Sequence, residues 1–141
     1  MDTLMLLSGL KILQVVNTIP KQTEGVFCNS NKVTKNSIFV CIKGSCCDGH
    51  DFALQAVNNG ATVVVCQKPL DIDVCQIVVE NTHKAMAYLA SAWHGFPAQK
   101  MRVICVVGTN GKTSTATLIY KVLCHTGHKS ALISTDRKSV V

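Results

Sequence analysis

The chain has 141 residues, of which 48% are hydrophobic, and a formal net charge of +6 at pH 7. This length fits one domain, or a small domain and the start of a second, and the hydrophobic content excludes a disordered chain. Lysine and arginine are scattered and not interleaved with aromatic residues, so the charge suits an anionic small molecule better than nucleic acid. The hydrophobic runs are shorter than the roughly 18 residues of a membrane span, so we expect no membrane insertion.

The sequence contains eight cysteines, several of them inside hydrophobic runs such as Val63-Val64-Val65-Cys66. In such runs cysteine behaves as a small hydrophobic residue. No pair has Cys-x-x-Cys spacing, and Cys46 and Cys47 are adjacent, which does not suit an ordinary disulfide. We therefore predict free thiols and a cytoplasmic protein.

The first sixteen residues are apolar enough to raise the question of a signal peptide. They carry Asp2 where a signal peptide would be basic, Lys11 interrupts them, and no small-x-small cleavage site follows. These features favour an amphipathic first helix.

Strands and helices then alternate along the chain. A buried strand is expected over residues 37–43, and a helix capped by Asp51 and ended by Gly60 follows it. Two further strands are expected over residues 62–66 and 76–79, the first of them rich in valine.

A longer helix is predicted to start at Asn81 or Thr82. Its apolar residues recur at helical spacing and predict one buried face, formed by Ala85, Met86, Leu89, Ala92 and Trp93. Residues 97–100, which begin with a proline, are the expected linker between two domains.

The last part of the chain is predicted as a strand over residues 102–107, a helix over residues 113–126 and the start of a strand over residues 130–134. The helix would end at Gly127. Its inward face would carry Leu118, Ile119, Val122 and Leu123. Strands regularly separated by helices indicate an α/β fold with a mostly parallel sheet.

The segment between the predicted strand and helix reads Gly108-Thr109-Asn110-Gly111-Lys112-Thr113-Ser114. Glycines allow backbone N–H groups to crowd onto an anion, and the start of a helix adds unpaired donors and partial positive charge. Lys112 can reach the β- and γ-phosphates of a nucleotide, and the Thr113 hydroxyl can bind Mg²⁺. The loop is shorter than Gly-x4-Gly-Lys-Thr, because Val106 stands where that pattern has glycine. We predict an ATP phosphate site here.

This loop resembles the ATP loop of the Mur ligases and of the related folylpolyglutamate synthases. The upstream segments Ser37-Ile-Phe-Val-Cys-Ile-Lys-Gly44 and Asp48-Gly-His-Asp-Phe52 look like the N-terminal domain of the UDP-N-acetylmuramoyl-dipeptide ligases, the MurE type. The resemblance runs from about Val26 to Thr135. It implies an N-terminal UDP-MurNAc-binding α/β domain over residues 1–97 and the start of a P-loop-type, parallel-sheet ATP-binding domain over residues 98–135.

The resemblance also implies a reaction. In that family ATP phosphorylates the D-Glu carboxylate of UDP-MurNAc-L-Ala-D-Glu, and the amine of a diamino acid, L-lysine or meso-diaminopimelate, displaces the phosphate during peptidoglycan synthesis. Such a transfer depends on charge neutralisation by a metal and a lysine, here Mg²⁺ and Lys112. We expect a monomer whose further catalytic parts lie outside these residues, so the 141 residues alone should have no ligase turnover.

The uridine-contacting segment of the family usually reads Asp-Ser-Arg-x-Val, and here it is Asn29-Ser30-Asn31-Lys32-Val33. Ser30 keeps the hydroxyl, so the resemblance assigns it a contact with the UDP-sugar, and Cys28 beside it is included. The loop of Ser45, Cys46 and Cys47 would line the same pocket. Asn stands at both charged positions, which removes any salt bridge there.

Structural interpretations remain open at several of these positions. Ser30 could be a turn residue, and the segment from Asp48 to Asp51 could be a turn with a helix cap. Cys124, His125 and His128 superficially suggest a metal site, but a solvated helix end is the simpler interpretation.

Two other functions compete with the dipeptide ligase. One is a folylpolyglutamate synthase-like ligase, which usually has Gly-Ser after the loop lysine and, as the resemblance implies, lacks a UDP-binding domain before the loop. The other is a nucleotide-sugar-binding fragment without catalysis. Residues 136–141 do not resemble the family and look like a translated sequencing adaptor, so we expect them to be a non-native tail.

Overall fold

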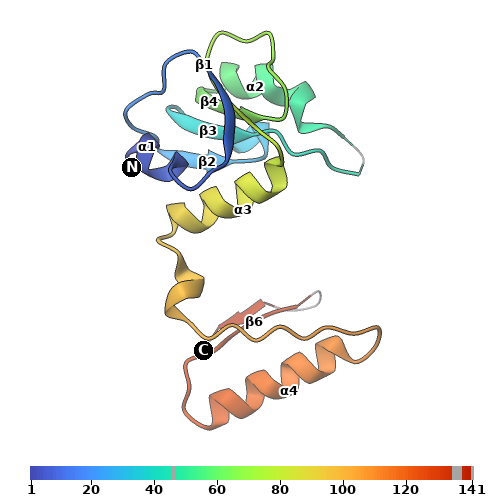
Figure 1. The fold of residues 1–141 in the computed structure, drawn as a ribbon. Coiled ribbons are helices and arrows are strands. Elements are labelled where there is room, and N and C mark those ends of the chain that lie inside the picture. The colour runs from blue at the N-terminus through green and yellow to red at the C-terminus, as the bar shows by residue number, and fades with distance from the viewer. Residues whose placement is uncertain (46, 135–137, 141) are drawn as a thin grey trace. The chain divides into compact units, whose positions relative to one another are not determined.

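The computed structural model describes residues 1–45, 47–134 and the backbone of residues 138–140. The chain divides into two compact units, Met1–Met101 and Arg102–Val141 (Figure 1). The division follows a short 3-10 helix, η3 (Pro97–Lys100), which is the segment expected to link two domains.

The first unit is built around a five-stranded sheet with the strand order β1-β5-β4-β3-β2. Its strands are β1 (Ile12–Val16), β2 (Gly25–Phe27), β3 (Ser37–Val40), β4 (Ala61–Cys66) and β5 (Cys75–Val79). From β2 to β5 all neighbours are parallel, and β1 pairs with β5 in the antiparallel direction at one edge. The predicted α/β class with a mostly parallel sheet is confirmed.

Helices cover both faces of this sheet. One face packs on α1 (Thr3–Leu7) and α3 (Thr82–Trp93), and the other packs on α2 (Ala53–Asn58). Figure 1 shows α2 and α3 on opposite sides of the strands. Successive β3 residues alternate between the two cores, with Ile38 on the α3 side and Phe39 on the α2 side, as the period-two geometry of a strand requires. Both faces are therefore buried, which explains the hydrophobic runs of the inner strands.

The helix expected within residues 1–16 is confirmed only in part. Within this segment only α1 is helical, and its N-cap Asp2 accepts a hydrogen bond from Leu4 N at 2.8 Å. Ser8 and Gly9 follow α1, and β-branched residues dominate β1, so the second half of the segment prefers an extended backbone. Pairing with β5 then fixes that half as an edge strand.

The strand predicted over residues 37–43 is shorter in the structure. Regular pairing ends at Val40, although Cys41 N still donates to Val65 O at 2.9 Å. Beyond it the chain turns back on itself, and Lys43 and Asp48 form an isolated antiparallel bridge. The strand therefore leads directly into a narrow loop.

Asp48, and not Asp51, provides the helix cap in this region. A 3-10 helix, η2 (Gly49–Phe52), precedes α2, and the Asp48 carboxylate accepts a hydrogen bond from His50 N at 3.0 Å. The α-helix itself begins at Ala53, close to the start that an Asp51 cap predicts, but its N-cap is Phe52, which makes no side-chain cap bond.

Helix α3 matches its prediction closely. Asn81 is the N-cap, and its side chain accepts a hydrogen bond from Lys84 N at 2.9 Å. The five residues of the predicted face are buried or half-buried against the sheet: Ala85, Met86, Leu89, Ala92 and Trp93.

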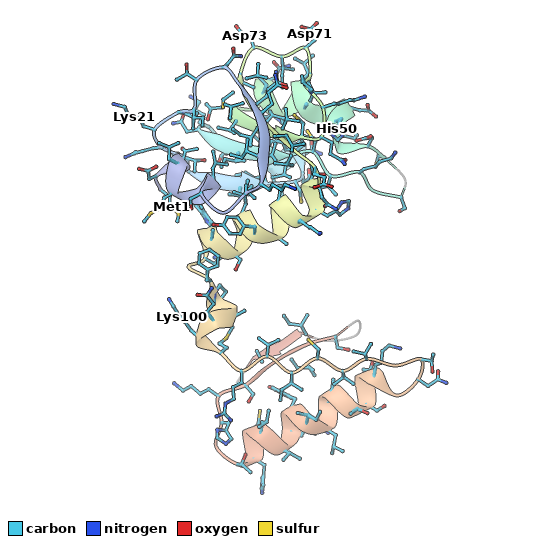
Figure 2. The ribbon with its side chains drawn as sticks, viewed as in Figure 1. Met1, Lys21, His50, Asp71, Asp73 and Lys100 are labelled. Carbon is cyan, nitrogen blue, oxygen red and sulfur yellow. The ribbon has the colours of Figure 1, made fainter. Side chains whose placement is uncertain are left out.

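The connection between β4 and β5 is a loop, although parallel neighbours usually need a longer crossover. The buried side chain of Gln76 holds this loop in place. Its Oε1 accepts from Leu70 N at 2.8 Å, and its Nε2 donates to Leu70 O at 2.9 Å and to Ile72 O at 3.2 Å. Asp71 and Asp73 are exposed at the outside of the loop (Figure 2).

The second unit contains α4 (Lys112–His125), β6 (Ala131–Ile133) and β7 (Lys138–Val140). The two strands pair in the antiparallel direction. The strand predicted over residues 102–107 is not formed, and Val107 is 92% exposed. A buried parallel strand needs neighbours on both sides, and none of the described strands pairs with this segment.

The inward face predicted for α4 is only partly correct. Ile119 and Leu123 are half-buried, but Leu118 and Val122 are exposed. The only strands described in this unit, β6 and β7, form a two-stranded sheet, which gives a helix little surface to cover. Gly127 ends the helix in the left-handed conformation, with φ +81°, as predicted.

The expectation about residues 136–141 stays a prediction. Residues 136, 137 and 141 lie outside the described residues, and the strand β7 covers the others.

Candidate functional site

A cleft of about 380 Å³ lies in the first unit, where β2 and β3 give way to loops. We call it the Ser30 cleft. Its lining residues are Cys28, Asn29, Ser30, Asn31, Phe39, Ile42, Gly44, Cys47, Gly49 and Phe52. The cleft brings together three of the predicted substrate-binding residues, Cys28, Ser30 and Cys47. Ligands of α/β proteins commonly bind at this carboxyl edge of the strands.

Ser30 begins a short 3-10 helix, η1 (Ser30–Lys32), and is 6% exposed. Its hydroxyl donates to Gln55 Oε1 at 2.8 Å, and its carbonyl oxygen accepts from Asn59 Nδ2 at 2.9 Å. These bonds tie the loop after β2 to α2. Because a hydroxyl also carries two acceptor lone pairs, the structural and the ligand-binding interpretations of Ser30 are compatible.

The loop between Lys43 and Asp48 forms another part of the wall. Gly44 N donates to Cys47 O at 2.9 Å, which holds Gly44 and Cys47 together. Cys47 is exposed and lines the cleft, whereas Ser45 is exposed and is not among the lining residues. Cys46 lies outside the described residues, so its predicted role stays a prediction.

The segment from Asp48 to Phe52 supplies lining residues that the sequence prediction missed. Gly49 N donates to Ile42 O at 2.9 Å. A Cβ on Gly49 would lie 2.5 Å from Ile42 N, so only glycine lets the two backbones approach this closely. The signal was present in the sequence, because this segment carries part of the family resemblance, but it was interpreted as a turn and a cap.

His50 connects this segment to the end of β4. Its Nδ1 lies 2.5 Å from Asp48 Oδ1, and its Nε2 accepts from Gln67 N at 3.1 Å. An imidazole that accepts at Nε2 carries its proton on Nδ1 and donates it to the carboxylate. The hydrogen bonds from the backbone N–H and the ring of His50 lower the pKa of Asp48. Figure 2 shows His50 in the first unit.

The phosphate loop lies in the second unit, immediately before α4. Gly111 is the N-cap of α4 with φ +74°, a conformation that favours glycine, and it has no side chain to bond the first N–H groups of the helix. The first backbone bond of the helix runs from Thr115 N to Gly111 O at 2.9 Å. The early N–H groups of α4 can therefore donate to an anion.

Two side chains of the predicted phosphate site have hydrogen-bond partners within this unit. Lys112 Nζ donates to the carbonyl oxygen of Thr109 at 2.8 Å, which holds the ammonium group against the loop. The hydroxyl of Ser134 lies 3.5 Å from that of Thr113, a long and weak contact. Both groups are exposed or half-buried, so a phosphate can reach them. Ser114, in the first turn of α4, is exposed as well.

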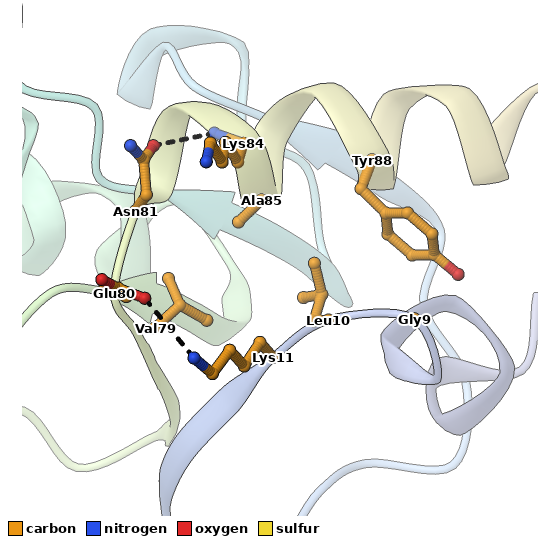
Figure 3. Close-up of a pocket in the computed structure, with 9 residues that line it drawn as sticks. All are labelled: Gly9, Leu10, Lys11, Val79, Glu80, Asn81, Lys84, Ala85 and Tyr88. Carbon is orange, nitrogen blue, oxygen red and sulfur yellow. Dashed lines mark hydrogen bonds and ion pairs between the residues drawn. The ribbon is translucent and has the colours of Figure 1, made fainter.

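A larger hollow of about 620 Å³ lies elsewhere in the first unit, between the start of β1 and α3 (Figure 3). We call it the Tyr88 cleft. Figure 3 shows Tyr88 at one end of it and the exposed ion pair of Lys11 and Glu80, 3.8 Å apart, at the other. None of the residues predicted to bind a ligand lines this hollow.

The described residues contain no group of three or more potential metal-binding side chains of the His, Cys, Asp and Glu types. In the same described part of the chain, no helix has both the length and the apolar character to cross a membrane.

Comparison with known proteins defines the family. A family model described as "Mur ligase family, catalytic domain" matches residues 22–102. A Bacillus cereus protein named UDP-N-acetylmuramoyl-L-alanyl-D-glutamate--2,6-diaminopimelate ligase is 40% identical over 120 residues, covering 83% of this chain and 24% of that protein. UDP-N-acetylmuramyl-tripeptide synthetase 2 of Oceanobacillus iheyensis is 38% identical over 139 residues, covering 96% of this chain and 28% of that protein.

Solved structures agree with this result. The MurF ligase of Thermotoga maritima, solved in complex with ADP, is 30% identical with a TM-score of 0.54, covering 73% of this chain and 24% of that chain. MurF of Acinetobacter baumannii is 25% identical with a TM-score of 0.70, covering 88% of this chain and 27% of that chain. The fold and these matches define an α/β unit of the kind found in cell-wall ligases, and the chain belongs to the Mur ligase family. It spans about a quarter of the length of the relatives it matches.

Proposed function

We propose that this chain supplies the UDP-sugar-binding unit and the ATP phosphate loop of a ligase that adds a diamino acid to UDP-MurNAc-L-Ala-D-Glu in peptidoglycan synthesis. The single observation that carries the proposal is that Cys28, Ser30 and Cys47, assigned from the sequence to one substrate, line one cleft. The names of the relatives point to the same substrate.

In this proposal the uridine end of the substrate occupies the Ser30 cleft. The hydroxyl of Ser30 remains in place through its bond to Gln55 and presents its lone pairs to the ligand. Cys28 and Cys47 form apolar walls of the kind that accommodates a base, and Ser45 and Cys46 lie in the adjoining loop. Because Asn replaces both charged residues of the family segment, recognition depends on neutral hydrogen bonds.

The loop from Gly108 to Ser114 would hold the triphosphate of ATP. Backbone N–H groups at the start of α4 would donate to phosphate oxygens, and Lys112 would exchange its bond to Thr109 O for a contact with the β- and γ-phosphates. The Thr113 hydroxyl suits one oxygen position of a Mg²⁺ ion that also binds phosphate and water. When bound, Mg²⁺ would neutralise phosphate charge during transfer.

The chemistry follows from the poor leaving group of a carboxylic acid. Transfer of the γ-phosphoryl group to the D-Glu carboxylate converts hydroxide into phosphate as the leaving group, and the amine of the diamino acid then forms the amide. The residues of this chain contribute positioning and charge neutralisation to this reaction. Diaminopimelate is the amino acid that the name of the Bacillus cereus relative specifies, and we propose the same class here, in a cytoplasmic monomer.

Two alternatives have different consequences. A folylpolyglutamate synthase-like ligase would not need the first unit, yet the family match over residues 22–102 lies in that unit except for its last residue. A binding fragment without catalysis would bind the nucleotide sugar but would never turn over.

Separate calorimetric titrations of UDP-MurNAc-L-Ala-D-Glu and ATP test the proposal. We expect one site for each ligand, competition of UDP with the first, and no competition between the two. A chain that binds neither UDP nor the UDP-sugar would contradict the proposal.

A further inference from the structure

Two thiols, far apart in the sequence, lie on the same cleft. Cys28 follows β2, Cys47 lies in the loop after β3, and both are free, exposed and among the lining residues of the Ser30 cleft. Both side chains are exposed, so core packing does not explain the two cysteines at these positions. Exposed thiols are accessible to small reagents, whereas buried ones are protected.

Three other cysteines of the first unit differ in this respect. Cys41, Cys66 and Cys75 are buried in the sheet. Burial, with the neighbouring Cys66 and Asp48, raises the pKa of Cys41 to about 12, and burial raises the pKa of Cys66 to about 11. Since the thiolate is the reactive form, these thiols are doubly protected, by lack of access and by protonation. Among the cysteines of this unit that the structure describes, reaction is therefore directed to the cleft.

We propose that Cys28 and Cys47 form a covalent modification site for low-molecular-weight disulfides, and that the adduct closes the Ser30 cleft to nucleotides. The proposal adds regulation to the site described above and rests on the proposed binding of UDP there. It needs no contact between the two thiols, because either adduct would occupy the cleft.

The reaction is a thiol–disulfide exchange. The cysteine gives up its proton, and its sulfur attacks one sulfur of a small disulfide such as oxidised glutathione. The S–S bond of the reagent breaks, one half becomes bonded to the protein, and the other half leaves as a thiolate that takes up the proton. The protein thiol is oxidised, half of the reagent is reduced, and an excess of free thiol reverses the reaction.

The size of the cleft supports blockage by one adduct. Its volume of about 380 Å³ is near the lower end of the roughly 300–1,000 Å³ of small-molecule pockets. A tripeptide attached to either wall would fill much of this space. Gly49 and Ile42, which also line the cleft, are in close backbone contact and leave little room on that side.

The test uses the 141-residue chain with Cys46→Ser in every sample, since Cys46 adjoins Cys47. The chain is treated with oxidised glutathione, adducts are located by peptide mass spectrometry, and UDP binding is measured by calorimetry before and after treatment. The variants are Cys28→Ser, Cys47→Ser and the double variant, each compared with its own untreated sample. Cys105→Ser is the matched control, because Cys105 is also exposed but lies in the second unit.

We expect adducts on Cys28 and Cys47 but not on Cys41, Cys66 or Cys75. The number of UDP sites should fall in proportion to the modified fraction and recover with dithiothreitol. UDP should slow modification of the two cleft thiols but not of Cys105. In the double variant treatment should leave binding unchanged, whereas the Cys105→Ser chain should remain as sensitive as the parent.

Two different results would overturn parts of this account. If the reduced chain binds UDP and a fully modified chain binds it equally well, the modification proposal is wrong and the UDP site stands. If the reduced chain binds no UDP although the adducts form on the cleft thiols, the proposed function fails first and the proposed regulation fails with it.

Discussion

The hydroxyl of Ser30 donates a hydrogen bond to Gln55 and lies on the wall of the candidate UDP cleft. One side chain thus serves both the local fold and the ligand. Sequence comparison alone cannot separate these roles, because both require a small hydroxyl residue at this position.

Substitution Ser30→Ala should affect both roles. It removes a nearly buried hydrogen bond, so the free energy of unfolding should fall by about 1 kcal/mol, measured by urea denaturation. UDP affinity should fall as well, measured by calorimetry at a temperature where the variant is fully folded. Ser8→Ala is the control, because Ser8 makes an exposed bond to Met5 O away from the cleft. Unchanged UDP affinity in Ser30→Ala would remove this residue from the binding site.

Lys112 is the corresponding residue of the phosphate loop. Lys112→Ala should weaken ATP binding by about 2 kcal/mol, or about thirtyfold, because a charge-assisted contact with phosphate is lost. UDP binding should not change. Lys121, exposed on the same helix, is the matched control, and Lys121→Ala should bind ATP as the parent chain does. Equal ATP affinity in both variants would contradict the phosphate-loop assignment.

Asp48 gives a prediction for acid stability. Its pKa is lowered from the ordinary value of 3.8 by the N–H and ring of His50. The stabilisation is therefore present above about pH 4 and is lost as the pH falls through the lowered value in the folded state. Asp48→Asn should make the acid limb of the stability curve shallower, measured by urea unfolding between pH 2 and about 6. An acid limb that is unchanged in Asp48→Asn would contradict this account.

At the scale of elements, the approach of η2 to the chain after β3 shapes the cleft. Gly49→Ala would place a methyl group 2.5 Å from Ile42 N and 2.7 Å from Ile42 O. Because backbone cannot yield as a flexible side chain does, we expect a loss of about 2 kcal/mol in the free energy of unfolding and weaker UDP binding. Gly44→Ala, whose Cβ would meet Cys47 O at 3.2 Å, should cost less. Thermal unfolding of the two variants would compare them, and equal midpoints would contradict this account.

The elements also show what sequence reasoning can and cannot supply. Helix α3 was predicted with its cap and its buried face because its signals are local: Asn81 and a repeated apolar spacing. The first helix was predicted only in part, because pairing with β5, a contact distant in sequence, makes residues 12–16 a strand. The strand predicted over residues 102–107 was wrong for a related reason. Apolar composition indicates a strand but cannot supply the neighbouring strands with which it must pair. For the cleft, Ser30 came from a motif, whereas Phe39 and Ile42 enter it only through three-dimensional packing.

At the scale of the whole molecule, the two units differ in how much core they have. Both hydrophobic clusters belong to the first unit, whereas among the described residues of the second unit only Leu132 is a buried hydrophobic residue. We therefore expect the first unit to dominate cooperative unfolding and to hold the UDP-sugar without help from the second. The phosphate loop depends on a helix start, which is a local feature. It should therefore bind ATP on its own, but more weakly than the first unit binds the UDP-sugar.

A single titration experiment tests the central claim that uridine and adenine nucleotides bind at separate, identified sites. UDP and then ATP are added to the ¹⁵N-labelled chain, and the amide resonances are followed by NMR. UDP should shift the amides of Ser30, Asn31 and Gly49, and ATP should shift those of Gly111, Lys112 and the residues that follow. Shifts by UDP at the phosphate loop, or at the Tyr88 cleft without any at Ser30, would contradict the account.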